Sequence, residues 1–131
     1  MKNLFYLLMI FVLLECDNSS SIVMFDNYDD GLLNASEYDQ NILLIFDFLG
    51  NPNNSVRRMI YSNRFYDKLQ YTTIIILNVD DPNEGNLNRN LQINKYGTNT
   101  QPMYYLLDSK GEIIKGPKGY CTELEFANFI E

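Results

Sequence analysis

Histidine and tryptophan are absent from this sequence, and cysteine occurs only twice, at Cys16 and Cys121. The lack of histidine removes the side chain that most often acts as a general acid or base and as a metal ligand. Two cysteines so far apart in the chain cannot supply the ligands of a tetrahedral zinc site. We therefore expect neither a metal nor a cofactor.

Basic residues are also scarce, with 10 Lys and Arg against 17 Asp and Glu, so the formal net charge is −7. The basic residues are scattered, whereas a nucleic-acid-binding protein needs a basic face, and this excludes that class. One acidic cluster, Asp80, Asp81 and Glu84, contains oxygen ligands of the kind that a hard cation prefers. It lacks the residue alternation of an EF-hand loop, which favours a solvated loop.

Apolar residues, by contrast, are plentiful. They make up 46% of the 131 residues, and the aromatic residues are 10 Tyr and 8 Phe. This length predicts one domain with one core, and this composition excludes global disorder.

The first 15 residues have the pattern of an export leader. Lys2 precedes an unbroken apolar run from Leu4 to Leu14, which has the length of a signal-peptide core and is short for a membrane span. Cys16 follows one residue after this run, as in the lipobox of bacterial lipoproteins, although Glu15 stands where that motif has a small residue. We expect residues 1–15 to be a lipoprotein leader and residues 16–21 a tether. The alternatives are an ordinary secretory leader and an uncleaved anchor.

The remaining residues, 22–131, alternate between strand and helix patterns. Apolar runs predict strands near 22–25, 41–48 and 71–79, and spaced apolar residues predict helices over 26–40, from 55 to about 69, and over 86–96. A hairpin follows, formed by 103–107 and 112–115 around Gly111, and Thr122 and Glu125 form a capping box that opens the last helix. The order β-α-β-α-β-α-β-β-α predicts an α/β sandwich: parallel strands covered by helices, and a C-terminal antiparallel hairpin.

Three stretches resemble thioredoxin-fold proteins, and in particular the C-terminal thioredoxin-like domain of thiol–disulfide interchange reductases. Asp47-Phe48-Leu49-Gly50 followed by Arg57-Arg58-Met59 is similar to the segment around that family's redox motif. Gln101-Pro102 with the following Leu107-Asp108, and Pro117-Lys118-Gly119-Tyr120, are similar to later family segments. The resemblance implies a three-layer α/β/α sandwich with a central mixed sheet over residues 22–131.

The resemblance also locates what is missing. Counted back from Arg57, the two redox cysteines of the family fall on Asn53 and Val56, and no cysteine occurs between Cys16 and Cys121. Thioredoxin chemistry needs a thiolate at a helix N-terminus and a second cysteine that resolves the mixed disulfide. Asn53 and Val56 can do neither, so we predict no catalytic residue at this turn.

A groove is the remaining candidate site. The resemblance implies that the Gln101–Pro102 bond is cis and that the backbone of Gln101 faces the turn formed by Asn53, Asn54, Ser55 and Val56. An extended peptide can add to such a backbone as a further strand. The alternative is that Pro102 belongs to the fold alone.

Two further residues have both a functional and a structural interpretation. Asp47 falls where redox-active relatives keep a buried acid that moves protons, and without thiols it is expected to be an acid bonded to water or backbone. Cys121 precedes a helix N-terminus, which can lower the pKa of a thiol, but the favoured interpretation is a half-buried cysteine that packs beside Tyr120. If Cys16 is not lipidated, a Cys16–Cys121 disulfide is a further option, and a lone thiol can also pair with another chain.

The sequence therefore predicts a thioredoxin-like protein of the bacterial cell envelope or periplasm, without the CxxC motif and not catalytic. It would be anchored to the membrane through a lipid on Cys16 and would bind a peptide or an envelope protein in the groove beside Pro102. The alternative is a thiol–disulfide oxidoreductase that acts through Cys121 or with the thiol of a partner.

Overall fold

The computed structural model describes residues 22–50 and 55–131, so the expected leader, the tether and Cys16 lie outside the described residues. Its five strands are β1 (Met24–Phe25), β2 (Ile42–Asp47), β3 (Thr73–Asn78), β4 (Met103–Leu107) and β5 (Ile113–Lys118). Its helices are α2 (Tyr28–Tyr38), α3 (Ser55–Ile60), α4 (Asn63–Leu69), α5 (Gly85–Tyr96) and α6 (Glu123–Ile130).

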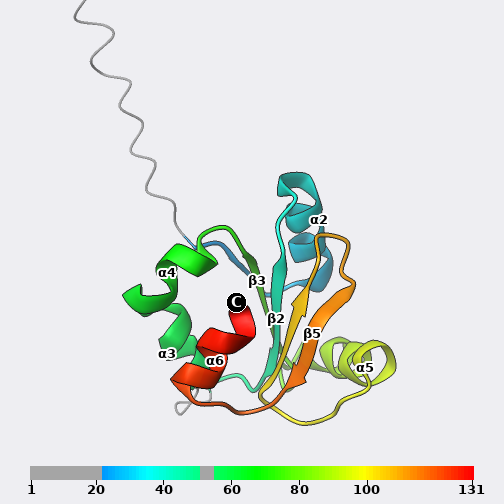
Figure 1. Ribbon diagram of the computed structural model, residues 1–131. Helices are drawn as coiled ribbons and strands as arrows, with labels where there is room; N and C mark the ends of the chain where they lie inside the picture. The colour runs from blue at the N-terminus through cyan, green and yellow to red at the C-terminus, as the bar shows by residue number, and fades with distance from the viewer. Residues whose placement is uncertain (1–21, 51–54) are drawn as a thin grey trace, which may run out of the picture.

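The five strands form one mixed sheet in the order β1-β3-β2-β4-β5. β1, β3 and β2 are parallel, β4 is antiparallel to β2, and β5 is antiparallel to β4. Helices α3, α4 and α6 cover one face, and α2 and α5 cover the other (Figure 1). The predicted three-layer α/β/α sandwich with a C-terminal hairpin is confirmed.

The apolar runs of the central strands fill two cores at once. Side chains alternate between the faces of a strand, so Leu43 and Ile45 of β2 face α3, α4 and α6, while Leu44 and Phe46 face α2 and α5. All six residues of β2 are buried. This is why the sequence of β2 reads as apolar without alternation, as is typical of a central strand covered on both faces.

Local signals set most element boundaries. Asn27 caps α2 with its side-chain oxygen, Gly97 ends α5 with a positive φ of 68°, and Gly111 has a φ of 84° in the hairpin. Thr122 and Glu125 form the predicted capping box of α6.

Gly31, inside α2, serves packing. A Cβ at this position would meet the side chain of Ile75 in the sheet below. The helix can therefore lie closer to β3 than it could with any other residue at this position.

One prediction about the elements was wrong. A single helix was expected from residue 55 to about residue 69, and the structure has two, α3 and α4, joined at Tyr61 and Ser62. The Oγ of Ser62 accepts a hydrogen bond from the backbone N–H of Arg64 at 3.1 Å, which starts a second helix. The apolar residues of both helices still face the same core, which explains why their spacing resembled one continuous helix.

Among the described residues, no helix combines the length and the apolar character that crossing a bilayer requires.

Candidate functional site

The candidate site lies at the C-terminal end of β2. Asp47 closes β2, is fully buried, and lies opposite Asn78 of β3 in the parallel register. Phe48 and Leu49 follow it into solvent and are 39% and 52% exposed. The backbone N–H of Leu49 donates to Oδ1 of Asp80 at 2.6 Å, which ties this segment to the loop after β3.

The far side of the predicted groove is only partly within the described residues. Asn53 and Asn54 lie outside them, and Ser55 and Val56 form the first turn of α3. The placement of this turn relative to Pro102 therefore stays a prediction.

The near side of the groove, Gln101–Pro102, adjoins the end of β2. Met103 pairs with Phe46 in the antiparallel register, so continuing that register by one residue brings Pro102 opposite Asp47. The peptide bond between Gln101 and Pro102 is cis. Both residues are partly exposed.

A buried glutamine of α5 holds the loop that leads to Pro102. Gln92 is fully buried, and its Nε2 donates to the carbonyl of Thr100 at 3.0 Å and to the hydroxyl of Thr98 at 3.3 Å. Its Oε1 accepts from Nε2 of Gln101 at 2.6 Å. A buried amide with its donors and acceptor engaged fixes the geometry of what it contacts. The loop therefore presents a defined backbone to solvent.

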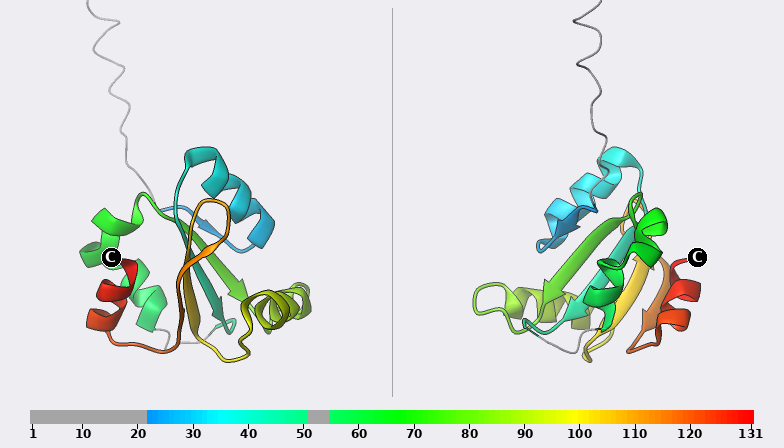
Figure 2. Two further views of the ribbon diagram at one scale, coloured as in Figure 1. Left: turned by 45° about the vertical axis from the view of Figure 1, so that its right-hand side comes forward. Right: turned by 90° about the vertical axis from the view of Figure 1, so that its left-hand side faces the viewer.

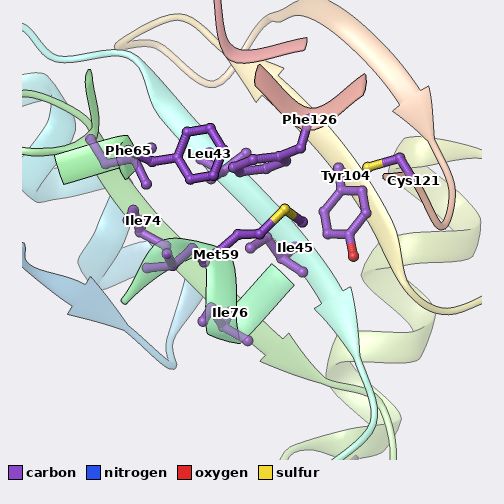
Figure 3. Packing of buried hydrophobic residues seen from close by; sticks show 11 residues of the cluster. Leu43, Ile45, Met59, Phe65, Ile74, Ile76, Tyr104, Cys121 and Phe126 are labelled. Carbon is purple, nitrogen blue, oxygen red and sulfur yellow. The ribbon is translucent and has the colours of Figure 1, made fainter. Parts of the chain in front are cut away.

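Cys121 lies away from solvent, in the core between the sheet and α6. It is 2% exposed and packs in the cluster that includes Phe126, Met59 and Tyr104 (Figure 3). Burial raises the pKa of the Cys121 thiol above its usual value, although Lys118 acts in the opposite direction. A raised pKa lowers the fraction of reactive thiolate, so this environment suits a packing role better than a nucleophile.

Tyr104 is a residue that sequence reasoning did not single out. It is fully buried, and its hydroxyl oxygen has no hydrogen-bond partner among the described residues. Burial raises the pKa of Tyr104 far above its usual range, and the nearby Cys121 and Asp47 add to this effect. Nothing in the sequence of this apolar strand distinguishes Tyr104, because a tyrosine in such a strand is expected only to pack its ring into the core.

The acidic residues after β3 do not converge on one point. Asp80 accepts from Leu49, whereas Oδ1 of Asp81 accepts from the backbone N–H groups of Asn83 and Glu84 at 2.8 and 2.9 Å. These two hydrogen bonds hold the pKa of Asp81 below its usual value. Among residues 22–50 and 55–131, no group of three or more acidic, cysteine or histidine side chains is arranged to hold a metal ion.

Comparison with solved structures identifies the fold. The chain is similar to a poplar thioredoxin h, with a TM-score of 0.56, 14% identity, and coverage of 80% of this chain and 88% of that one. It is similar to the thioredoxin of Plasmodium falciparum, with a TM-score of 0.58, 11% identity and coverage of 84% and 95%. A disulphide isomerase from Xylella fastidiosa gives a TM-score of 0.52, 14% identity and 70% coverage of each chain.

Neither a protein-family model nor a curated protein sequence matches the chain. At 11–14% identity the structural likeness establishes the thioredoxin-like fold. It does not transfer the activity of these proteins to this chain.

Proposed function

We propose that this protein is a non-catalytic, thioredoxin-like binding protein that holds an extended peptide or a protein segment beside Gln101–Pro102. One observation carries the proposal: the chain has no cysteine between Cys16 and Cys121, and Cys121 is buried with a raised pKa. A thiol–disulfide reaction needs an accessible thiolate, and no described residue supplies one.

The geometry of the loop before Pro102 supports a binding role. Gln92 fixes the loop from inside the molecule, while Gln101 and Pro102 are partly exposed at the end of β2. A rigid backbone at a strand end can pair with an extended segment at a low entropic cost, because little of it needs to be ordered on binding.

Redox activity is the first test. Full-length protein in detergent is assayed for reduction of insulin with dithiothreitol as the electron source. The expected rate equals that without protein, for the wild type and for Cys121→Ser alike. A wild-type rate above that of Cys121→Ser would support the alternative function, a thiol–disulfide oxidoreductase acting through Cys121. That alternative also fits the disulphide isomerase among the structural neighbours.

Binding is the second test. A benzophenone amino acid at position 101 is expected to cross-link a protein partner in cells, and the same group at position 37, exposed on α2, is the control. Gln92→Leu should lower the yield at position 101 because Thr98 and the carbonyl of Thr100 lose their hydrogen bonds to Gln92. Equal yields at both positions would contradict the proposal.

We also propose that the protein is exported and anchored through a lipid on Cys16, on the basis of the leader pattern alone. The intact mass of the protein extracted from membranes measures this directly. Loss of residues 1–15 together with added acyl mass is expected, and the mass of the unmodified full chain would contradict it.

A further inference from the structure

The chain enters the described part of the molecule at the end of the sheet opposite Pro102. Ile22 is the first described residue, and β1 runs parallel to β2 and β3, so the N-terminal ends of these three strands lie together. The backbone N–H of Ile74 donates to the carbonyl of Val23 at 3.4 Å. Pro102, by contrast, adjoins the C-terminal end of β2, at Asp47. We call the end that contains Ile22 the entry end.

The C-terminal end of α2, the start of β3 and the turn between β4 and β5 also lie at the entry end. The hydroxyl of Thr73 is within hydrogen-bond distance of Oε1 of Gln40, at 3.0 Å, which joins the start of β3 to the residues after α2. The hydroxyl of Ser109 donates to Oδ1 of Asp39 at 3.0 Å, which adds the turn between β4 and β5. In both views of Figure 2, α5 lies at the opposite end of the molecule from this end of α2.

Large apolar side chains are exposed at the entry end. Tyr38 ends α2, Tyr71 lies two residues before β3, and Val23 directly precedes β1; they are 63%, 70% and 49% exposed. None of the three belongs to either buried core, so core packing does not require an apolar residue at these positions. A tyrosine has an apolar ring and a polar hydroxyl, and it is enriched where the headgroups of a bilayer meet the hydrocarbon. These side chains therefore suit a lipid surface.

The charges beside these residues do not attract anionic lipid. Asp39, Asp108 and Glu112 lie around the turn between β4 and β5 together with one cation, Lys110. Oδ1 of Asp108 accepts from the backbone N–H groups of Lys110 and Glu112, both at 2.9 Å, and the bond from Glu112 is the main reason why the pKa of Asp108 lies below its usual value. Asp108 is therefore ionised at neutral pH. Attraction to a membrane must come from the apolar side chains and not from charge.

The length of the tether limits which end can reach a membrane. Six steps of chain separate Cys16 from Ile22, and six steps span at most about 21 Å in any conformation. The six residues of β2 cover about 17 Å, at roughly 3.3 Å per residue. With Cys16 held in the bilayer, the entry end can touch the lipid without extension of the tether. The Pro102 end can do so only if the molecule is inverted and the tether is almost fully extended.

We propose that the entry end docks on the phospholipid bilayer, with Tyr38, Tyr71 and Val23 at the level of the headgroups. The inference rests on the proposed anchor at Cys16, because an anchor keeps the local concentration of lipid high enough for a contact of only a few side chains to form. Docking in this way turns the Pro102 end away from the membrane. A partner therefore reaches the loop at Pro102 from the aqueous side.

The test uses tryptophan as a reporter, because the chain contains none. Full-length protein is reconstituted into vesicles of phosphatidylcholine with acyl chains brominated near the headgroup, which quench a tryptophan at that depth. Tyr71→Trp is compared with Tyr120→Trp, which is 73% exposed and follows the end of β5 that pairs with the start of β4. Relative to unbrominated vesicles, we expect a loss of emission at position 71 and no loss at position 120.

A second substitution tests the role of the apolar side chains. In the Tyr71→Trp protein, Tyr38→Asp should reduce the quenching, because a charged group then replaces a ring at the interface. The control, Tyr61→Asp, makes the same change at a position that is 69% exposed and lines a cavity with Leu49, beyond the C-terminal end of β2; it should leave the quenching unchanged. Replacing part of the phosphatidylcholine with phosphatidylglycerol should not increase the quenching.

Flotation of the vesicles on a density gradient separates two kinds of failure. Protein that does not float with the vesicles would overturn both the inference and the proposed anchor. Floating protein that is quenched equally at positions 71 and 120 would overturn the inference alone. Equal effects of the two aspartate substitutions, or stronger quenching with phosphatidylglycerol, would do the same, and the anchor itself is identified by the intact mass.

Discussion

Two adjacent tyrosines on β4 face opposite cores and differ in how their hydroxyl groups are satisfied. The hydroxyl of Tyr105 donates to the carbonyl of Tyr96 at 3.0 Å and can therefore accept a hydrogen bond from the hydroxyl of Thr98 at 2.7 Å. The hydroxyl of Tyr104 has no such partner among the described residues, although its side chain is fully buried. The same residue type therefore stabilises the fold in different ways at the two positions.

Replacing each tyrosine by phenylalanine should separate these contributions. Tyr105→Phe is expected to lower the free energy of unfolding by about 1–2 kcal/mol, because it leaves the buried carbonyl of Tyr96 without its donor. Tyr104→Phe is expected to be neutral or stabilising, because it removes a buried hydroxyl that gains nothing from the protein. Urea unfolding of both variants measures the difference, and equal losses would contradict the assignment.

The sequence analysis singled out some residues of the candidate site and missed others. Gln101, Pro102, Asp47 and Cys121 were identified because they stand in a family pattern or carry a reactive group. Gln92 was missed because a glutamine on a helix is usually exposed, and its burial depends on a loop that closes over it. Tertiary contacts of this kind leave no local signal.

At the scale of elements, short polar side chains decide where helices begin. The apolar residues of this segment have a helical spacing throughout, yet one helix ends and another begins at Ser62. The hydroxyl of Ser62 accepts from the backbone N–H of Arg64, which has no partner within the new helix. The capping box at α6 was predictable for the opposite reason: Thr122 and Glu125 lie in a fixed spacing directly before an apolar run.

The capping box should make the free energy of unfolding depend on pH in the acidic range. Hydrogen bonds from the backbone N–H of Thr122 and from its hydroxyl, together with Lys118, hold the pKa of Glu125 below its ordinary value of 4.5. A lowered folded-state pKa means that the stabilisation is present above about 4.5 and is lost as the pH falls through the lower pKa of the folded protein.

Glu125→Gln can keep the two hydrogen bonds from Thr122 and removes the titration. Between about pH 6 and about pH 3 the wild type should therefore lose more stability than Glu125→Gln, measured as the midpoint of urea unfolding at each pH. Thr122→Ala should lower the free energy of unfolding by about 1 kcal/mol at neutral pH, because the cap is lost. Parallel pH curves for the wild type and Glu125→Gln would show that the carboxylate has no such role.

At the scale of the whole molecule, the excess of acidic residues acts against the folded state. The net charge is −7, and the excess negative side chains repel one another more strongly in a compact chain than in an extended one. Three ion pairs are found among the described residues, including Lys68 with Glu131 at 2.6 Å; they are partly exposed and contribute little against this repulsion.

Sodium chloride should therefore raise the melting temperature at neutral pH, because screening weakens this repulsion. Near the isoelectric point, where the net charge vanishes, the same salt should have little effect or lower the melting temperature by weakening the ion pairs. Thermal unfolding followed by circular dichroism at both pH values tests this. A fall in melting temperature with salt at neutral pH would show that the ion pairs outweigh the repulsion.

The contact between Gly31 and the side chain of Ile75 restricts how this sequence can change over time. A larger residue at position 31 would push α2 outwards, and Ala35 and the Asn27 cap would move with that helix. Substitution there requires the side chain of Ile75 to move or to be replaced by a smaller one. A glycine at position 31 together with a large residue at position 75 is therefore a pattern by which distant sequences with the same close packing of α2 on β3 can be recognised.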